Sequence, residues 1–414
     1  MRYRVIAAAI AALALGVVVA TTASASTKSH TLVVWLQVDA KTGWPKVVAN
    51  ATAAFKKANP GWNVNVQYQT WGTHLQNFDA AIAGNNVPDV IEMGNTEMTK
   101  YMAAGAFANL TSYKGKFANS SHWLTGLTNS STYNGKLEGV PYYAGSRLVT
   151  YRTDLFSQAG VTKPPTSLAA LETDLGKVGS KVTGVPGFTP FYMAGTDWYS
   201  ALSFVFDYGG SIATFSKGKW VGQLASTKSV AGLTAYKQFF LGYSPHSAAT
   251  LDEANPAPYT VYGANPGRAA AIFGPGWYSC CTGNYKNVTG QFLMPSHVPG
   301  QHMTSWLGGS DLGVPKQGHQ QAQARSWISF FTNSANEKAL QKVGNVPNAT
   351  NLFDNSLNDQ AAKKSWFVPT AKHWVDVESG NVIRHMLANI LTGTPVKQAA
   401  QQADASMNNL LNQP

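Results

Sequence analysis

Cysteine is almost missing from this sequence, and the two cysteines present are neighbours, Cys280 and Cys281. Two cysteines cannot form the usual four-ligand zinc site without histidines beside them, and the nine histidines are dispersed along the chain. His297 and His302 are close in sequence, but they lie in a stretch rich in proline and glycine without a nearby carboxylate. The sequence therefore predicts neither a metal site nor a cofactor.

Acidic residues are also scarce, with 20 Asp and Glu against 31 Lys and Arg and a net charge of +11. The basic residues are scattered and form no stripe, so we expect no nucleic-acid partner. The only acidic clusters are Asp252-Glu253 and the pair Asp376 and Glu378, and both fall in polar stretches that we expect to be exposed. A glycoside hydrolase needs two carboxyl groups that flank the scissile bond. The sequence therefore favours a binding protein over an enzyme.

A membrane helix needs about 20 uninterrupted apolar residues, and no segment after the first residues approaches that length. The beginning is typical of a signal peptide: Arg2 and Arg4 precede an apolar run, and Ala23-Ser24-Ala25 is an A-x-A cleavage site. We expect residues 1–25 to be removed and the mature protein to lie outside the cytoplasm. An uncleaved membrane anchor is the alternative. No cysteine follows the run, so we expect no lipid-anchored start.

Aromatic residues, by contrast, are plentiful, including 12 Trp and 17 Tyr. Several of them stand at the end of an apolar run or beside a Gly or Pro turn, where a large flat side chain is well placed to stack on a ligand. The alternative for each is a place in a hydrophobic core. The candidates are Trp71, Tyr142, Trp198, Trp277, Trp306 and Trp374.

The first part of the mature sequence alternates between strand and helix patterns. Apolar periodicity predicts strands at 32–36, 64–68 and 88–91 and helices at 45–58 and 75–82. This order is typical of an open parallel sheet with helices on both faces, in which ligands bind beyond the carboxyl ends of the strands. A second block of the same character runs from residue 147 to about 292. We therefore expect two sheet-based lobes with a cleft between them.

The ordered series of short motifs resembles the solute-binding proteins of carbohydrate ABC importers, the group that includes maltose-binding protein. The motifs are Val33-Val34-Trp35, Asn59-Pro60-Gly61, Val87-Pro88-Asp89-Val90, Gly139-Val140-Pro141-Tyr142-Tyr143, Asp207-Tyr208-Gly209-Gly210, Gly274-Pro275-Gly276-Trp277 and Leu307-Gly308-Gly309. Each motif alone is weak, but their order and spacing over nearly the whole mature chain are specific.

The resemblance implies a two-lobe α/β fold, with mostly parallel sheets flanked by helices and a hinge between the lobes. The N-terminal lobe would comprise residues 26–144 and 296–346, and the C-terminal lobe residues 145–295 and 347–414. It also implies a monomer without catalytic residues that binds a carbohydrate, expected to be a di- or oligosaccharide, and delivers it to a membrane permease. A secreted carbohydrate-binding adhesin is the alternative, and a glycoside hydrolase is a more remote one.

Ligand positions carried over from the family combine carboxylates and amides with aromatic rings. A pyranose presents an apolar face to an aromatic ring and a rim of hydroxyls to polar groups. Arg147 is expected either to contact the ligand or to form an ion pair at the hinge. Together with the aromatic candidates above, the predicted ligand-binding residues are Asp39, Asn95, Glu97, Arg147, Asp197 and Tyr199, and the family places a further polar contact at Thr96. The chain departs from maltose-binding protein at Gly145-Ser146-Arg147 and at Cys280-Cys281.

We predict that Cys280 and Cys281 form a disulfide, because export places both in an oxidising space and neither has another cysteine to pair with. Two reduced, buried thiols are the alternative. A disulfide between neighbours closes almost no loop, so we expect only a local effect at the wall of the cleft.

Overall fold

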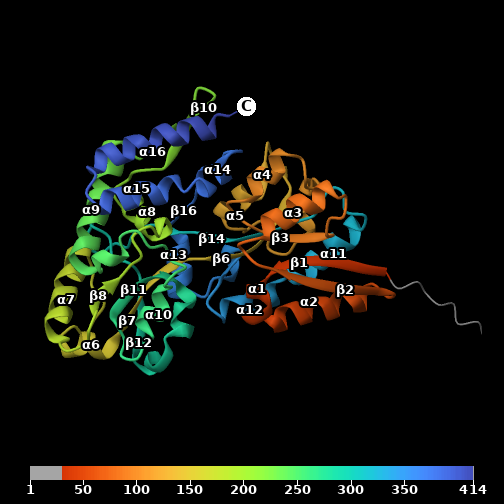
Figure 1. Ribbon diagram of the computed structural model, residues 1–414. Helices are drawn as coiled ribbons and strands as arrows, with labels where there is room; N and C mark the ends of the chain where they lie inside the picture. The colour runs from red at the N-terminus through yellow and green to blue at the C-terminus, as the bar shows by residue number, and fades with distance from the viewer. Residues whose placement is uncertain (1–29, 414) are drawn as a thin grey trace, which may run out of the picture.

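A computed structural model describes residues 30–413, which form two α/β lobes lying side by side (Figure 1). The predicted signal peptide, residues 1–25, lies outside the described residues. Among the helices of residues 30–413, none combines the length and the apolar character needed to cross a membrane.

The first lobe is built on a six-stranded sheet with the order β15-β6-β14-β3-β1-β2. Strand β1 runs parallel to β2 and β3, whereas β14 is antiparallel to both β3 and β6, and β15 is antiparallel to β6. The sheet is therefore mixed, not mostly parallel as expected, because apolar patterns predict strands but not their direction. The strands are β1 (His30–Gln37), β2 (Trp62–Gln69), β3 (Val90–Gly94), β6 (Gly139–Gly145), β14 (Gly308–Gly313) and β15 (Val346–Pro347).

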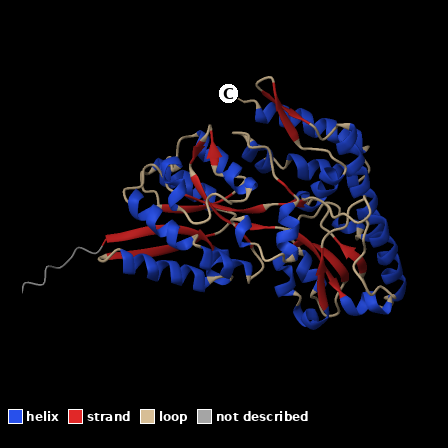
Figure 2. Ribbon diagram, turned by 180° about the vertical axis from the view of Figure 1, so that it is seen from behind, coloured by secondary structure: helices blue, strands red, loops and turns tan. Residues whose placement is uncertain are grey.

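Helices cover both faces of this sheet (Figure 2). On β1, Leu32, Val34 and Leu36 point to one face and pack against α2 (Pro45–Ala58) and α11 (Gln321–Phe331). Trp35 points to the other face, together with residues of α3 (His74–Ala83) and α4 (Met98–Ala103). Alternation along a strand sends successive side chains to opposite faces, so a nearly continuous apolar run serves two cores.

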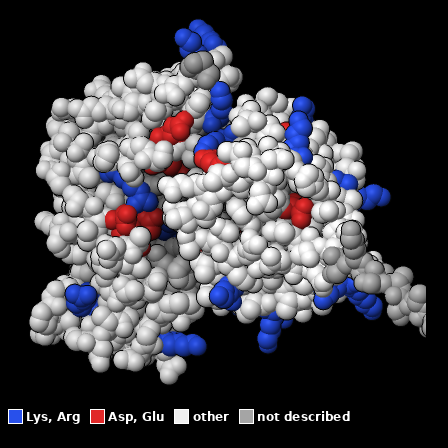
Figure 3. All heavy atoms as spheres, turned by 45° about the vertical axis from the view of Figure 1, so that its right-hand side comes forward, with Lys and Arg blue, Asp and Glu red and all other residues white. Residues whose placement is uncertain are grey.

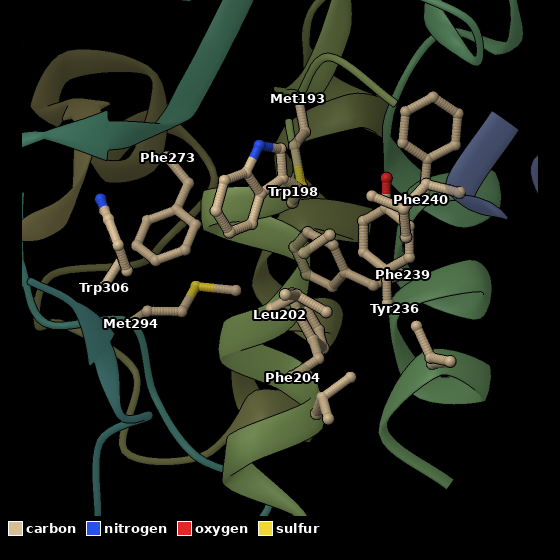
Figure 4. Close-up of a cluster of buried hydrophobic side chains, with 14 of the residues drawn as sticks. Met193, Trp198, Leu202, Phe204, Tyr236, Phe239, Phe240, Phe273, Met294 and Trp306 are labelled. Carbon is tan, nitrogen blue, oxygen red and sulfur yellow. The ribbon is translucent and has the colours of Figure 1, made fainter. Parts of the chain in front are cut away.

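The second lobe contains a four-stranded sheet with the order β12-β7-β11-β8. Its strands are β7 (Arg147–Arg152), β8 (Thr189–Tyr192), β11 (Ala269–Pro275) and β12 (Thr289–Phe292), and only the β11–β8 pair is parallel. Its core is rich in aromatic side chains, among them Trp198, Phe204, Tyr236 and Phe239 (Figure 4). The larger helices around it are α7 (Leu168–Lys181), α8 (Trp198–Asp207), α9 (Thr227–Tyr243), α15 (Val382–Leu391) and α16 (Val396–Leu411).

Shorter elements complete both lobes and their connections. The helices are α1 (Val38–Thr42), α5 (Thr125–Ser130), α6 (Thr153–Gln158), α10 (Pro258–Tyr262), α12 (Ser334–Gln341), α13 (Leu357–Lys363) and α14 (Trp374–Ser379). The strands are β4 (Thr132–Tyr133), β5 (Lys136–Leu137), β9 (Ala213–Ser216), β10 (Lys219–Gly222), β13 (Ser305–Trp306) and β16 (Ser365–Trp366).

The chain crosses between the lobes three times. The first crossing is at Ser146, between β6 of one sheet and β7 of the other. The second is at Leu307: Trp306 packs in the second core, and the strand that follows belongs to the first sheet. The third follows Leu352, which packs in the first core. Residues 296–306, which we expected in the N-terminal lobe, thus pack with the second lobe.

Candidate ligand-binding cleft

A cleft of about 350 Å³ lies between the lobes. On the first lobe, the lining residues follow β2 and β3. On the second lobe, they follow β11 or lie at the start of α8 and near the end of α14. The segments in which the chain crosses between the lobes form the floor of the cleft. Acidic and basic side chains gather beside the hollow between the lobes, while much of the same face is uncharged (Figure 3). The lining residues are Trp71, Gly94, Asn95, Thr96, Glu97, Tyr143, Gly145, Ser146, Arg147, Tyr199, Pro275, Trp277, Trp306, Gly308, Gly309, Asn345 and Glu378.

Two exposed tryptophans stand on opposite walls of this cleft. Trp71 is 41% exposed and follows β2 of the first lobe, and Trp277 is 38% exposed and follows β11 of the second lobe. They are the only tryptophans among the exposed large apolar residues of the described chain. Because exposing a tryptophan forfeits the free energy gained by burying it, two such residues facing one cleft mark a surface for a ligand.

Trp71 is held in place by two polar neighbours. Its Nε1 donates a hydrogen bond of 2.6 Å to Oδ2 of Asp39, at the start of α1. The ring of His74 meets the indole edge to face, with ring centres 5.2 Å apart, and its Nδ1 lies 2.9 Å from the carbonyl oxygen of Trp71. Asp39 does not line the cleft itself, so its link to the cleft is the hydrogen bond that it accepts from Trp71.

His74 also connects the tryptophan to Glu97. The other ring nitrogen, Nε2, lies 2.8 Å from Oε2 of Glu97, and the same oxygen accepts a hydrogen bond from the backbone N–H of Gly94. Burial alone would lower the pKa of His74, but the hydrogen bond and the charge of Glu97 outweigh it and raise the pKa. One wall of the cleft is thus a bonded series from Asp39 through Trp71 and His74 to Glu97.

Asn95 joins this wall to the floor of the cleft. Its Nδ2 donates a hydrogen bond of 3.1 Å to the carbonyl oxygen of Leu307, and its backbone N–H donates one to the carbonyl oxygen of Gly309. Gly309 has a φ of +147°, and a side chain there would collide with the carbonyl oxygen of Tyr143. The glycine lets β14 approach β6 closely and leaves a floor made of backbone. The side-chain oxygen of Asn95 is the atom left to accept a hydrogen bond from a ligand.

Arg147 lies at the second-lobe side of the cleft in an ion pair. Its Nη1 is 3.2 Å from Oδ2 of Asp197 and 3.1 Å from the hydroxyl of Ser200. Its guanidinium lies over the ring of Tyr199, 5.2 Å from the centroid. Asp197 is buried, caps the N-terminus of α8 and does not line the cleft. The structure therefore gives Arg147 the expected ion pair and also a place in the lining.

Tyr199 and Trp306 form a second aromatic patch in the cleft. Their ring centres are 5.2 Å apart, and Trp306 stacks on Phe367 at 5.5 Å with nearly parallel planes. Trp306 is only 6% exposed, so it presents an edge to the cleft and its body to the core.

Three aromatic candidates do not line the cleft. Tyr142 is fully buried in the first core, where its hydroxyl accepts a hydrogen bond from Trp44. Trp198 and Trp374 are buried in the second core, with ring centres 6.0 Å apart (Figure 4 shows Trp198). The expectation treated all three as residues at strand ends or in loops. Two of them instead begin helices, and the third lies within β6, so their side chains turn inward.

Glu378 is the main cleft residue absent from the predicted ligand contacts. Its carboxylate accepts hydrogen bonds from Nε1 of Trp374 at 2.7 Å and from the hydroxyl of Thr96 at 3.2 Å. Burial raises the pKa of Glu378 to about 7. The hydrogen bonds from Trp374 and Thr96 lower this pKa, whereas the charge of Glu97 raises it further. We expected this acidic stretch to be exposed, and for Glu378 that was wrong. Glu378 follows Trp374 by four positions, which places both side chains on one face of a helix, and this spacing could have indicated that Glu378 lies beside the tryptophan.

Thr96, which follows the third predicted strand, lies in the lining of the cleft. Tyr143, Ser146 and Asn345 also line the cleft without having been among the predicted contacts. Tyr143 and Ser146 lie next to the predicted residues Tyr142 and Arg147 in the sequence, which was an available indication for them. Nothing comparable marks Asn345, which reaches the cleft only through the fold.

Cys280 and Cys281 are joined by a disulfide in the structure. They lie in the same 3₁₀ helix as Trp277 (Gly276–Cys281), and both are exposed to solvent. Neither lines the cleft, so the structure does not place them at the wall of the cleft, where we expected them. Within residues 30–413, no group of three or more His, Cys, Asp or Glu side chains is arranged to hold a metal ion.

The two-lobe fold and the cleft define a ligand receptor, and the comparison with known sequences gives its family. Residues 37–338 match the bacterial extracellular solute-binding proteins, and the chain belongs to that family. It is therefore a solute-binding protein that acts outside the cytoplasm, and not an enzyme.

Known relatives and structures agree with this assignment. The chain is 27% identical to the diacetylchitobiose binding protein DasA of Streptomyces coelicolor over 93% of its length and 90% of that protein. Its structure resembles the GacH receptor of Streptomyces glaucescens, with a TM-score of 0.75, 19% identity and coverage of 93% and 100% of the two chains. The sugar-binding protein MalE of Xanthomonas citri gives a TM-score of 0.77 at 19% identity, with 92% and 97% covered. The two structural likenesses establish the fold.

Proposed function

We propose that this protein binds a carbohydrate, a di- or oligosaccharide, in the cleft between its lobes and delivers it to the membrane permease of an ABC importer. The observation that carries the proposal is the pair of exposed tryptophans, Trp71 and Trp277, on opposite walls of one cleft. Two aromatic faces on different lobes can cover a flat ligand only when the lobes approach each other, so binding and closure are one event.

The polar groups of the cleft suit the rim of a sugar. Glu97 and Glu378 supply carboxylate acceptors, Asn95 supplies an amide oxygen, and Arg147 supplies donors. Hydrogen bonds to charged groups are roughly twice as strong as neutral ones, so a few of them can replace the hydrogen bonds to water that the sugar hydroxyls lose on binding. A pocket with an apolar lining and few placed polar groups is the usual design for small ligands.

The known relatives support a sugar as the ligand. DasA is named for binding diacetylchitobiose, the GacH receptor was solved in complex with acarbose, and MalE is described as a sugar-binding protein. We further propose that the protein is a monomer, that it is exported by the signal peptide of residues 1–25, and that closure occurs about the three crossings near Ser146, Leu307 and Leu352.

A screen of mono-, di- and oligosaccharides by thermal shift tests the proposal. A sugar at 100 times its Kd should raise the free energy of unfolding by about 2.7 kcal/mol. Small-angle scattering should show a smaller radius of gyration in the complex, which an adhesin without lobe closure would not show. If no sugar changes either signal while an amino acid or a peptide does, the substrate class is wrong.

A further inference from the structure

The charges around the cleft are opposite in sign to the charge of the whole chain. The chain has 31 Lys and Arg against 20 Asp and Glu, a net charge of +11. At the cleft, however, Glu97 and Glu378 line the wall, and Asp39 and Asp197 bond directly to lining residues. Glu253 lies close enough for Arg147 and Asp197 to affect its pKa, which burial raises to about 7. Figure 3 shows acidic and basic side chains beside the hollow between the lobes.

The cationic groups near the cleft are already engaged by other carboxylates. Arg147 pairs with Asp197 at 3.2 Å. Arg384, behind the cleft, is 3.2 Å from Asp252 and 3.5 Å from Glu253. Arg147 is the only lysine or arginine among the residues that line the cleft. Two carboxyl groups, those of Glu97 and Glu378, thus line the cleft against one guanidinium, and that guanidinium is already paired with Asp197.

Glu97 and Glu378 come from opposite lobes, and the charge of Glu97 acts on the carboxyl of Glu378. Burial is the largest cause of the raised pKa of Glu378, and the charge of Glu97 raises this pKa further. Trp374, Thr96 and Arg384 lower it. His74 is bonded to Glu97, and Tyr199 is the other titratable group of the lining on the side of Glu378. A cation placed between the two carboxyl groups would relieve this repulsion and would hold the lobes together.

We propose that the ligand is an amino sugar, and that its protonated amine lies between Glu97 and Glu378 while its ring faces Trp71 or Trp277. This inference rests on the proposed function and specifies its substrate class. An ammonium group supplies three donors, its bonds to carboxylates are charge-assisted, and a tryptophan face attracts a cation. An acidic cleft on a basic protein also guides a cationic ligand to the site and turns it away from the outer surface.

The decisive measurement is calorimetric titration of the complete mature protein with three disaccharides of one linkage. They carry free amines, N-acetylated amines or hydroxyls at the same position, and the titrations are run near neutral pH and at low salt. The free amine should bind at least tenfold more tightly than the other two, and added salt should reduce the difference. If the acetylated or neutral sugar binds as tightly, the inference is overturned while the proposed function stands. If none of the three and no other sugar binds, the proposed function fails as well.

Proton release gives a second, independent readout. An ammonium group near Glu378 lowers the pKa of its carboxyl, which is about 7 in the free protein. At about pH 6 both this carboxyl and the free amine of the sugar carry their protons before binding, so binding there should expel a proton into the buffer. Titrations in buffers of different ionisation enthalpy measure that proton directly. The amino sugar should release it from the wild type, whereas the neutral sugar should not.

Substitutions locate the effect. Glu378→Gln should abolish the proton release and lower the preference for the amine by about tenfold, and Glu97→Gln should lower the preference without abolishing the release. Asp376→Asn is the matched control, because it removes a carboxyl from the same helix but outside the cleft lining. A preference unchanged in both cleft variants, or lost equally in the control, contradicts the proposal. If Glu378→Gln does not fold, the affinities of Glu97→Gln and the number of protons that the wild type releases on binding still test the proposal.

Discussion

The hydroxyl of Thr96 lies 3.2 Å from Oε2 of Glu378, and this hydrogen bond joins the two lobes across the cleft. Thr96 follows β3 of the first lobe, and Glu378 lies in α14 of the second, which contacts α4 in the upper half of the view in Figure 1. The three chain crossings lie elsewhere, so a cleft that opens about these crossings, as we propose, would lose this hydrogen bond.

The raised pKa of Glu378 predicts a pH-dependent stability. Its folded pKa is about 7 against an ordinary value of 4.5, so between these values the folded protein holds a proton that the unfolded chain has lost. The free energy of unfolding should therefore fall as the pH rises from about 4.5 to 7, by up to about 3 kcal/mol for this group.

Glu378→Gln should remove this contribution. The melting temperature of the variant should therefore rise relative to that of the wild type as the pH increases from about 5 to about 8. Asp376→Asn, on the same helix, should keep the pH dependence of the wild type. Thr96→Val should keep the fold and enlarge the radius of gyration of the unliganded protein in small-angle scattering. An equal pH slope in wild type and Glu378→Gln would show that the carboxyl is not buried in solution.

Trp277 is predicted to be a principal stacking surface for the ligand. Trp277→Ala should weaken sugar binding by about 1–3 kcal/mol, a range taken from aromatic stacking on planar bases. The unliganded melting temperature should move little, because the side chain is 38% exposed. Trp71→Ala should behave in the same way.

Trp374→Ala provides the contrast. This side chain is only 1% exposed, so its removal should cost about 3–5 kcal/mol of stability. A large loss of stability in Trp277→Ala, with unchanged affinity, would assign Trp277 to the core instead.

His74 is predicted to position Trp71 and Glu97 for the ligand. His74→Ala should reduce affinity by about 1 kcal/mol and change the fluorescence of Trp71, because both hydrogen bonds of the imidazole are lost. In a Trp71→Ala background the same substitution should cost less, since the partner it positions is gone. Because the pKa of His74 is raised, its contribution to stability is complete below its ordinary value of 6.5 and is lost as the pH rises through the folded value. Additive losses in the double variant would argue against the positioning role.

The Cys280–Cys281 disulfide is predicted to be present in the secreted protein. The intact mass should be that of the oxidised form, and the double variant Cys280→Ser, Cys281→Ser should melt close to the wild type, because the bond closes almost no loop. Sugar affinity should also stay close to that of the wild type, since neither cysteine lines the cleft. A fully reduced mass, with both thiols alkylated only after unfolding, would rule the bond out.

Local patterns predicted the first lobe well because its elements are regular. The expected helix at 45–58 is α2 (Pro45–Ala58), and the alternation at 64–68 is part of β2 (Trp62–Gln69). The direction of β14 was not predictable, since it depends on a chain return after residue 300 that no local pattern records. The same holds for the crossing at Leu307, which only packing reveals.

The candidate site was predictable where ligand-facing residues follow a strand. Trp71, Asn95 and Glu97 follow β2 and β3 and line the cleft as expected of a sheet edge. Trp198 and Trp374 look the same in sequence, but each begins a helix whose inner face meets the second core. A single sequence does not distinguish a tryptophan at a loop from one in the first turn of a helix.

The order of strands in the first sheet governs when this protein can fold. Strand β14 lies between β6 and β3, inside the sheet, yet its residues Gly308–Gly313 come late in the chain. A chain that has emerged only as far as β13 must leave the inner edges of β3 and β6 without their common partner. Because such unpaired strand edges invite association with other chains, the exported polypeptide has to remain unfolded or be shielded until most of it has crossed the membrane. Truncation before residue 308 should accordingly prevent the first lobe from folding, because its sheet then lacks the strand that joins β3 to β6.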